Sequence, residues 1–266
     1  MLNAFRKLFS APPERALPAI PPGERVYAIG DIHGRLDLFV EIAEAIETDN
    51  ATRGPAKSTV ILLGDLVDRG PDSAGVLTAA RIWASQRDVR IIAGNHEEMF
   101  LEAFESPDVL RHFLRFGGKE TLLSYPVDPD DYFAAELHEV QEMMTRAVPQ
   151  EDLDFIRSFE NTVVVGDYVF VHAGIAPNVP LESQTTGQLR WIREPFLSHE
   201  EDHGFVVIHG HTISDEPEVL HNRIGIDTGA YESGRLTALG LEGTERWFIS
   251  AQENNGAIST EIRSAA

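Results

Sequence analysis

The chain has 266 residues, of which 42% are hydrophobic and 24% charged, and its formal net charge is -21 at pH 7. That length and composition suit a globular protein with a buried core. The negative charge excludes a nucleic-acid binder that relies on a broad basic face, so no nucleic-acid partner is expected. The chain contains no cysteine, which rules out disulfides, thiolate metal sites and a cysteine nucleophile and fits a reducing cytoplasm.

The first 22 residues are rich in proline and are expected to form a flexible N-terminal tail. They lack the apolar core of a secretory signal, and no segment of the chain approaches the roughly 20 apolar residues of a membrane span. We therefore expect no stable membrane insertion and a cytoplasmic location.

Three short apolar runs in the first half, residues 26–29, 60–63 and 89–92, predict buried strands. Apolar residues at helical spacing between them, from Leu38 to Ile46 and from Val76 to Trp83, predict two helices. This alternation predicts a parallel unit whose ligands gather at the carboxyl ends of the strands.

The region from about residue 98 to residue 155 is expected to be a helical insertion that covers the site, with a loop at Asp128–Asp131. Further strands are predicted at 162–165 and 168–171, joined through Gly166-Asp167 as a two-residue hairpin.

The remaining strands are predicted at 205–208, 224–226, 236–241 and 246–249, in a largely antiparallel second sheet. Residues 251–266 are expected to be a polar C-terminal tail, which leaves residues 23–250 as a single domain. The predicted fold class is α/β, with two packed mixed β-sheets flanked by helices.

Side chains that bind metals follow the predicted strands. Carboxylates, imidazoles and an amide carbonyl suit borderline divalent cations such as manganese, iron or zinc. One carboxylate, such as that of Asp65, can bridge two cations, which then clamp a phosphoryl group and activate a bridging water as nucleophile. The candidate residues are Asp31, His33, Asp65, Asn95, His96, His172, His209 and His211.

These residues lie in motifs that resemble the metallophosphoesterase superfamily, from about Val26 to Leu241. Within it, the chain is most similar to the phosphoprotein phosphatase family of serine/threonine phosphatases, including its phage and bacterial members. The longest motif, from Gly64 to Gly70, is the most specific. The motifs are Gly30-Asp31-Ile32-His33-Gly34, Gly64-Asp65-Leu66-Val67-Asp68-Arg69-Gly70, Gly94-Asn95-His96-Glu97, Trp191-Ile192-Arg193-Glu194, Gly210-His211-Thr212 and Ile226-Asp227-Thr228-Gly229-Ala230.

The resemblance implies two divalent metal ions per chain, with manganese as the first choice and iron or zinc as alternatives. Asp31 and His33 would hold one ion, and Asp65 would bridge both. The second ion would be held by Asn95, His172 and His211.

The resemblance also implies four catalytic residues. His96 would be the general acid that protonates the leaving alkoxide, and Asp68 would orient it. Arg69 and Arg193 would bind the phosphoryl oxygens, together with Asn95.

Several assignments have competitors within the chain. His209 lies two residues before His211 and is either a neighbour of the metal ligands or a packing residue. Arg190 lies three residues before Arg193, but Trp191 and Glu194 fix the motif and favour Arg193. Ile213 stands where many nucleases of the superfamily have a further histidine, which disfavours a nuclease, and Asp227 is a candidate neighbour of the ligands.

The predicted function is hydrolysis of phosphoserine and phosphothreonine by direct attack of a metal-bridging hydroxide, with a phosphoprotein as substrate. The alternative is a hydrolase of diadenosine polyphosphates. Those enzymes tend to replace the aspartate of Asp-Arg-Gly and to carry Asn-His-Asp, whereas this chain has Asp68 and Glu97. A non-catalytic interaction module would lack ligands, and none is missing. No oligomeric state is predicted.

Overall fold

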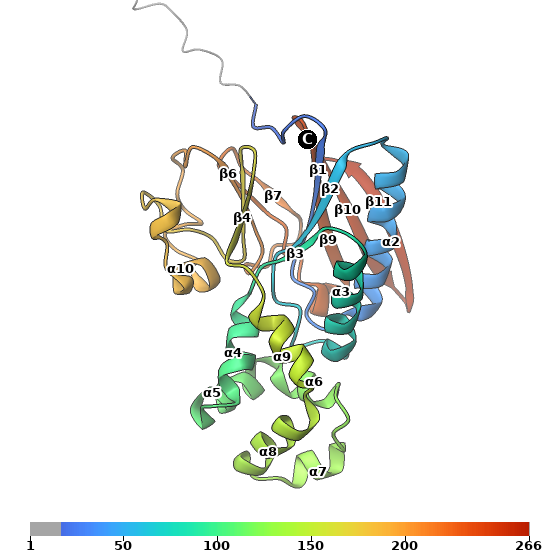
Figure 1. The fold of residues 1–266 in the computed structure, drawn as a ribbon, viewed down its shortest axis with the longest axis vertical. Helices are drawn as coiled ribbons and strands as arrows, with labels where there is room; N and C mark the ends of the chain where they lie inside the picture. Colours follow the sequence, from blue (N-terminus) through green and yellow to red (C-terminus); the bar gives the residue numbers. More distant parts are fainter. Residues whose placement is uncertain (1–16, 266) are drawn as a thin grey trace, which may run out of the picture.

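Two β-sheets packed face to face, with helices on their outer sides, make up the protein (Figure 1). A computed structural model describes residues 17–265. The first sheet has the strand order β11-β10-β9-β1-β2-β3, and the second has β4-β5-β6-β8-β7. The predicted fold class is therefore confirmed.

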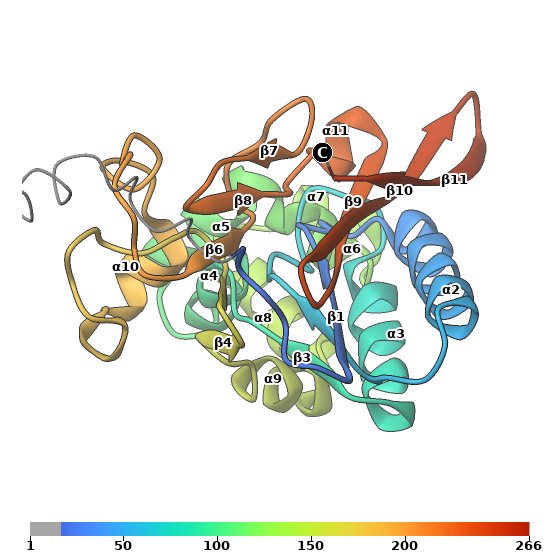
Figure 2. The same ribbon diagram turned by 90° about the horizontal axis from the view of Figure 1, so that it is seen from above.

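The first sheet contains the three predicted parallel strands and is extended by three antiparallel ones. Its outer face carries α2 and α3, which Figure 2 shows from above. The bounds are β1 Glu24–Ile29, α2 Leu36–Thr52, β2 Lys57–Leu62, α3 Ser73–Gln86, β3 Val89–Ile91, β9 Arg235–Glu242, β10 Glu245–Asn254 and β11 Ala257–Ser264.

The second sheet contains the predicted hairpin, whose turn residue Gly166 has a positive φ of 56°. The α10 segment covers its outer side (Figure 1). The bounds are β4 Thr162–Val165, β5 Tyr168–Val171, η2 Leu181–Ser183, α10 Thr186–Trp191, β6 Val206–His209, β7 Glu218–Val219 and β8 Arg223–Gly225. The short helix α11, Ala230–Ser233, lies between β8 and β9 in the chain.

Strand β1 explains why both faces of the first sheet are buried. Val26 and Ala28 pack into the core between the two sheets, while Tyr27 and Ile29 pack into the core beneath α2 and α3. Alternate residues of a strand point to opposite faces, so a strand buried on both sides needs a continuous apolar run.

The region between β3 and β4 is a group of short helices at one end of the sheets, which we call the cap (Figure 1). The residues expected to form a loop, Asp128–Asp131, instead begin α7, because the Asp128 carboxylate accepts the backbone N–H of Asp130 at 2.8 Å and Pro129 occupies the first turn. The bounds are α4 Asn95–Ala103, α5 Pro107–Phe113, η1 Leu114–Gly118, α6 Lys119–Leu123, α7 Pro129–Ala134, α8 Leu137–Ala147 and α9 Gln150–Arg157.

Two sequence predictions about the second half are wrong. The second sheet is not largely antiparallel, because β5, β6 and β8 run parallel and the α10 segment crosses between β5 and β6. The C-terminal tail from residue 251 is also wrong, because β10 runs to Asn254 and pairs with β11. Strand β11 is mostly exposed, so it carries no apolar alternation that would have revealed it.

The described end of the predicted N-terminal tail is packed against the domain. Ile20 is buried between the sheets, and its backbone N–H donates to the Gly243 carbonyl at 2.8 Å. Residues 1–16 of that predicted tail lie outside the described residues. Among the residues that the structure describes, no helix has the length and apolar character needed to cross a membrane.

A buried carboxylate ties α2 to the first sheet. Asp49 accepts the Tyr27 hydroxyl at 2.8 Å, the Trp247 indole N–H at 3.0 Å and the Arg53 Nε at 2.8 Å. Removing this acceptor would leave buried donors on β1 and β10 without partners, which is costly because they lose water without gaining a replacement.

We expect Asp49→Ala to lower the free energy of unfolding by about 3 kcal/mol. Urea denaturation followed by circular dichroism measures the change. Glu44→Ala, on the exposed face of the same helix, is the matched control and should change the stability by less than about 0.5 kcal/mol. Equal effects of the two substitutions would contradict the proposed role of the buried carboxylate.

Candidate metal centre and active site

The predicted site residues come together where the strands of both sheets end. Asp31 follows β1, Asp65 follows β2, and Asn95 begins α4 after β3. His172 follows β5, and His211 lies two residues after the end of β6. All five side chains are buried, so the site is built from polar groups held inside the protein.

Asp65 lies at the centre of the arrangement. Its carboxylate belongs to two groups of side chains whose ligand atoms all lie within 4.8 Å of one another: one with His33 and His96, the other with His172 and His211. The His33 Nε2 lies 3.6 Å from one Asp65 oxygen, and the His172 Nε2 lies 3.4 Å from the other. A carboxylate in this position suits the predicted bridging role.

The imidazoles are oriented by backbone carbonyls. The Nδ1 of His33 bonds the Val67 carbonyl at 2.8 Å, and the Nδ1 of His172 bonds the Leu63 carbonyl at 2.8 Å. In each ring this leaves Nε2 with its lone pair facing Asp65, which is the arrangement usual for histidine ligands. The Asn95 amide oxygen lies 3.0 Å from the His172 Nε2 and 2.9 Å from the His211 Nδ1.

Two buried atoms of the site have no hydrogen-bond partner among the described residues, namely Asp31 Oδ1 and His211 Nε2. Burial, together with the charges of Asp227 and Asp65, raises the pKa of Asp31 well above its usual value. Crowded carboxylates and unpartnered donor atoms are what a bound cation would satisfy. The site therefore fits divalent metal ions.

The protonation states agree with this fit. Burial lowers the pKa of His33 and of His172, and lowers that of His211 to about 3, so these rings are neutral as metal ligands must be. Burial opposes ionisation of Asp65, but the surrounding histidines outweigh it and its pKa is lowered.

His96 differs from the other histidines at the site. Its Nδ1 lies 2.6 Å from the Asp68 carboxylate. Burial disfavours the protonated ring, but the charge of Asp65 and the hydrogen bond that the ring donates to Asp68 outweigh burial and raise the pKa of His96. Although the His96 Nε2 lies only 3.9 Å from Asp65, a ring that favours its protonated form is poorly suited to ligation. By distance His96 belongs to the ligand group of His33 and Asp65, but its raised pKa marks it as a proton donor and not a ligand.

The two predicted phosphoryl-binding arginines lie beside the site. Arg69 donates to the His96 Nε2 at 3.0 Å and stacks over the Tyr231 ring at 4.7 Å. Arg193 donates to the His211 carbonyl at 3.4 Å. Arg190, the competitor of Arg193, forms an ion pair with Glu98 at 2.9 Å and so already has an anionic partner.

Several site residues adopt left-handed backbone conformations, each of which costs about 1–3 kcal/mol for a residue other than glycine. Positive φ values occur at His33 (47°), Asp65 (50°), Asp68 (73°), Arg69 (70°) and His211 (63°). Such a backbone persists only where its surroundings over-determine it.

Glu97 supplies much of that support, and sequence reasoning gave it no role. Its buried carboxylate accepts backbone N–H groups from Asp65 at 2.9 Å, Leu66 at 2.7 Å and Gly94 at 2.8 Å. Burial and the charge of Asp65 raise the pKa of Glu97 to about 7. The signal available in the sequence was its place in the Gly-Asn-His-Glu motif, directly after a ligand and the general-acid candidate.

The cap provides the second support. The Thr121 hydroxyl of α6 donates to the Asp68 carboxylate at 2.7 Å, and the Asp68 N–H donates back to Thr121 at 2.8 Å. The Gly117 carbonyl of η1 accepts the Arg69 N–H at 3.1 Å. The cap therefore holds both ends of the Asp68-Arg69 pair, which the sequence could not indicate.

The competing histidine is a packing residue. His209 is buried, its Nδ1 contacts the Gly210 carbonyl at 3.0 Å, and its ring lies 5.1 Å from that of Phe196. Burial lowers its pKa to about 4. Asp227, by contrast, does neighbour a predicted ligand, because its side chain contacts Asp31.

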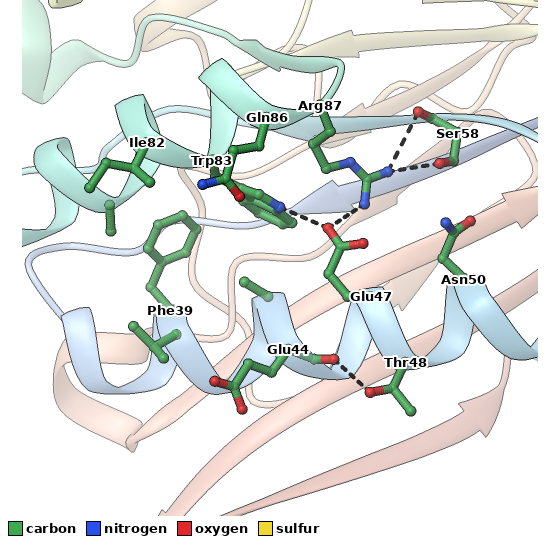
Figure 3. Close-up of a pocket in the computed structure, with 13 residues that line it drawn as sticks. Phe39, Glu44, Glu47, Thr48, Asn50, Ser58, Ile82, Trp83, Gln86 and Arg87 are labelled. Atoms are coloured by element: carbon green, nitrogen blue, oxygen red, sulfur yellow. Dashed lines mark hydrogen bonds and ion pairs between the residues drawn. The ribbon is translucent and has the colours of Figure 1, made fainter.

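A large surface cavity of about 940 Å³ lies away from this site, between α2 and α3 (Figure 3). Glu47 spans it and accepts both the Trp83 indole N–H and the Arg87 guanidinium. Size alone does not identify an active centre, since the buried histidines and aspartates lie elsewhere.

The model of one protein family, described as calcineurin-like phosphoesterase, matches residues 24–240. The chain belongs to the calcineurin-like phosphoesterase family. The resemblance to metallophosphoesterases inferred from the motifs is confirmed, and the family uses divalent metals, in agreement with the ligand groups around Asp65.

The relatives of the chain carry two kinds of name. An asymmetrical bis(5'-nucleosyl)-tetraphosphatase, PrpE of Bacillus velezensis, is 27% identical over 79% of this chain and 86% of its own length. Serine/threonine-protein phosphatase 2 of Escherichia coli is 28% identical over 80% of this chain and 90% of its own. A crystal structure of a candidate diadenosine tetraphosphatase shares the fold, with a TM-score of 0.60, 17% identity, and coverage of 94% of this chain and 100% of that chain.

We expect His211→Ala to lower the metal content from two ions per chain to about one, because it removes a predicted ligand of the second ion. Elemental analysis after loading with manganese and gel filtration measures the content. His209→Ala is the matched control and should retain two ions, because His209 faces Phe196 and the Gly210 carbonyl. The reverse result, with an ion lost only from the control, would exchange the two assignments.

Proposed function

We propose that the protein is a dinuclear-metal phosphomonoesterase that hydrolyses phosphoserine and phosphothreonine in proteins. The observation that carries the proposal is the 2.6 Å contact between His96 and Asp68. An alkoxide is a poor leaving group, so its departure needs a proton donor, whereas a phosphoanhydride leaves without one. A buried histidine that is paired with a carboxylate supplies such a donor.

Six residues are proposed to hold two divalent ions, with manganese as the preferred metal: Asp31, His33, Asp65, Asn95, His172 and His211. When bound, the ions supply Lewis-acid charge at the phosphoryl group and lower the pKa of a water molecule.

The protein's own side chains bind and protonate the substrate. Among residues 17–265, Arg69 and Arg193 have no carboxylate within ion-pair distance, so their guanidinium groups are available to the oxygens of a phosphoryl group, with Asn95 as a third proposed contact. Binding would draw Arg69 away from the His96 Nε2, to which it now donates. The nitrogen so released would take up a proton from solvent and pass it to the leaving alkoxide oxygen, while Asp68 would hold the ring in position.

A second candidate is a hydrolase of dinucleoside polyphosphates. A relative named as a tetraphosphatase and a relative named as a phosphatase have similar sequence identities to this chain, 27% and 28%. The substrate classes are separated by comparing kcat/KM of the manganese-loaded protein for phosphopeptides, a dinucleoside tetraphosphate and an aryl phosphate. Higher kcat/KM for the dinucleotide than for every phosphopeptide would overturn the proposal.

We expect His96→Asn to lower kcat for phosphoserine peptides by about 10²–10⁴-fold, since it removes the proton donor. The loss should be much smaller for an aryl phosphate, whose leaving group is more acidic. Steady-state assays of both substrates measure the contrast, and circular dichroism checks that the variant is folded. Full turnover of phosphopeptides by this variant would exclude His96 as the general acid.

We expect activity to fall as pH rises through the pKa of His96, because a general acid acts only when protonated. Asp68 contributes to raising that pKa, so Asp68→Asn should move the alkaline limb of the pH profile of kcat/KM to lower pH. Profiles of both proteins with the same phosphopeptide measure the shift. An unchanged alkaline limb would mean that another group controls it.

A further inference from the structure

We propose that Arg115, on the rim of the cap, binds acidic residues that flank the phosphorylated residue of the substrate. This inference rests on the proposed phosphoprotein substrate and adds a preference for its sequence. The rim is the stretch Val109–Lys119, which includes the end of α5 and all of η1.

The charge of the rim stands out in an acidic protein. From Val109 to Lys119 the chain carries Arg111, Arg115 and Lys119 but no aspartate or glutamate. Arg111 is paired with Asp108 at 2.8 Å, and Lys119 with Glu120 at 2.9 Å. Arg115 is exposed and forms no ion pair or hydrogen bond with any of residues 17–265.

Unpaired guanidinium groups are unusual in this chain. Among the arginines that the structure describes, four lack a carboxylate within ion-pair distance, and one of these, Arg246, donates to the Tyr168 hydroxyl at 2.9 Å instead. Two others are the proposed phosphoryl-binding residues, and the last is on the rim: Arg69, Arg193, Arg246 and Arg115. In a chain with a net charge of -21, a cation left free suggests an anion that comes from outside.

The backbone places the rim beside the phosphoryl-binding loop. The Gly117 carbonyl accepts the Arg69 N–H at 3.1 Å, and a Cβ added at Gly117 would lie 2.6 Å from the Arg69 nitrogen. Arg115 is two residues from this contact, which corresponds to at most about 7 Å of chain. A substrate in extended conformation covers that distance in two or three residues.

An aromatic surface adjoins the free cation. Phe116 is 45% exposed, and its ring lies 4.3 Å from that of His112, one helical turn earlier. A peptide backbone that passes over this pair can bury part of it while acidic side chains reach Arg115. The combination of one free charge and an apolar wall fits a peptide with aspartate or glutamate near the phosphoresidue.

The test compares phosphoserine peptides that carry three aspartates or three lysines at flanking positions, on either side of the phosphoserine, with an aryl phosphate that has no flank. The manganese-loaded protein should show higher kcat/KM for an acidic peptide than for its lysine counterpart. Arg115→Glu should lower kcat/KM for the acidic peptide by roughly tenfold and raise it for the lysine peptide. A pair of opposite charges in contact in water changes an affinity several-fold, and charge reversal replaces that attraction with a repulsion of similar size.

Three controls separate this role from a structural one. Arg115→Lys should retain the acidic preference, and the difference between peptides should shrink as salt rises from about 0.05 to 0.5 M, because screening shortens the range of the charge. Arg146→Glu reverses a charge on α8, elsewhere on the cap, and should leave the preference unchanged. Turnover of the aryl phosphate should be the same in all variants.

If phosphopeptides are hydrolysed at rates that depend neither on their flanking residues nor on Arg115, this inference is overturned and the proposed function stays intact. If the aryl phosphate or the dinucleoside tetraphosphate is hydrolysed but no phosphopeptide is, the proposed function fails and the inference fails with it.

Discussion

The site depends on the hydrogen bonds that the Glu97 carboxylate accepts from the backbone. This carboxylate is buried and gathers backbone N–H groups from two loops, those that follow β2 and β3. These donors offset the cost of burying a carboxylate next to that of Asp65. Because they hold the loop after β2 in a left-handed turn, the Asp65 carboxylate lies between both groups of histidines. Without that turn the two halves of the site would not share a residue.

One residue type serves two purposes in this site, and the surroundings decide which. Burial outweighs the charge of Asp65 and keeps the rings of His33, His172 and His211 neutral and suited to ligation. His96 is equally buried, but the carboxylate of Asp68 shifts the balance toward its protonated form. Ligation and proton donation can therefore coexist within a few ångströms.

Much of the site could be predicted because its residues follow strands, and parallel strands bring their ends together. The same reasoning could not assign Glu97, whose partners at 65 and 66 are some thirty positions away and are backbone atoms. It missed β11 because an exposed edge strand has no apolar face. It placed a loop at Asp128–Asp131 although the aspartate and proline there also begin helices. The contact from Gly117 to Arg69 leaves no pattern in the sequence, since it depends on how the cap packs.

The Gly117 contact has a consequence for how such a protein can diverge. The cap reaches Arg69 through a backbone carbonyl, which no side-chain replacement can delete, and through a glycine that leaves no room for a Cβ. Most side chains on the cap surface can therefore change during evolution while the course of the cap backbone beside the site stays the same. Insertions or deletions between α4 and η1 would displace that carbonyl, so length should be constrained there more tightly than residue identity.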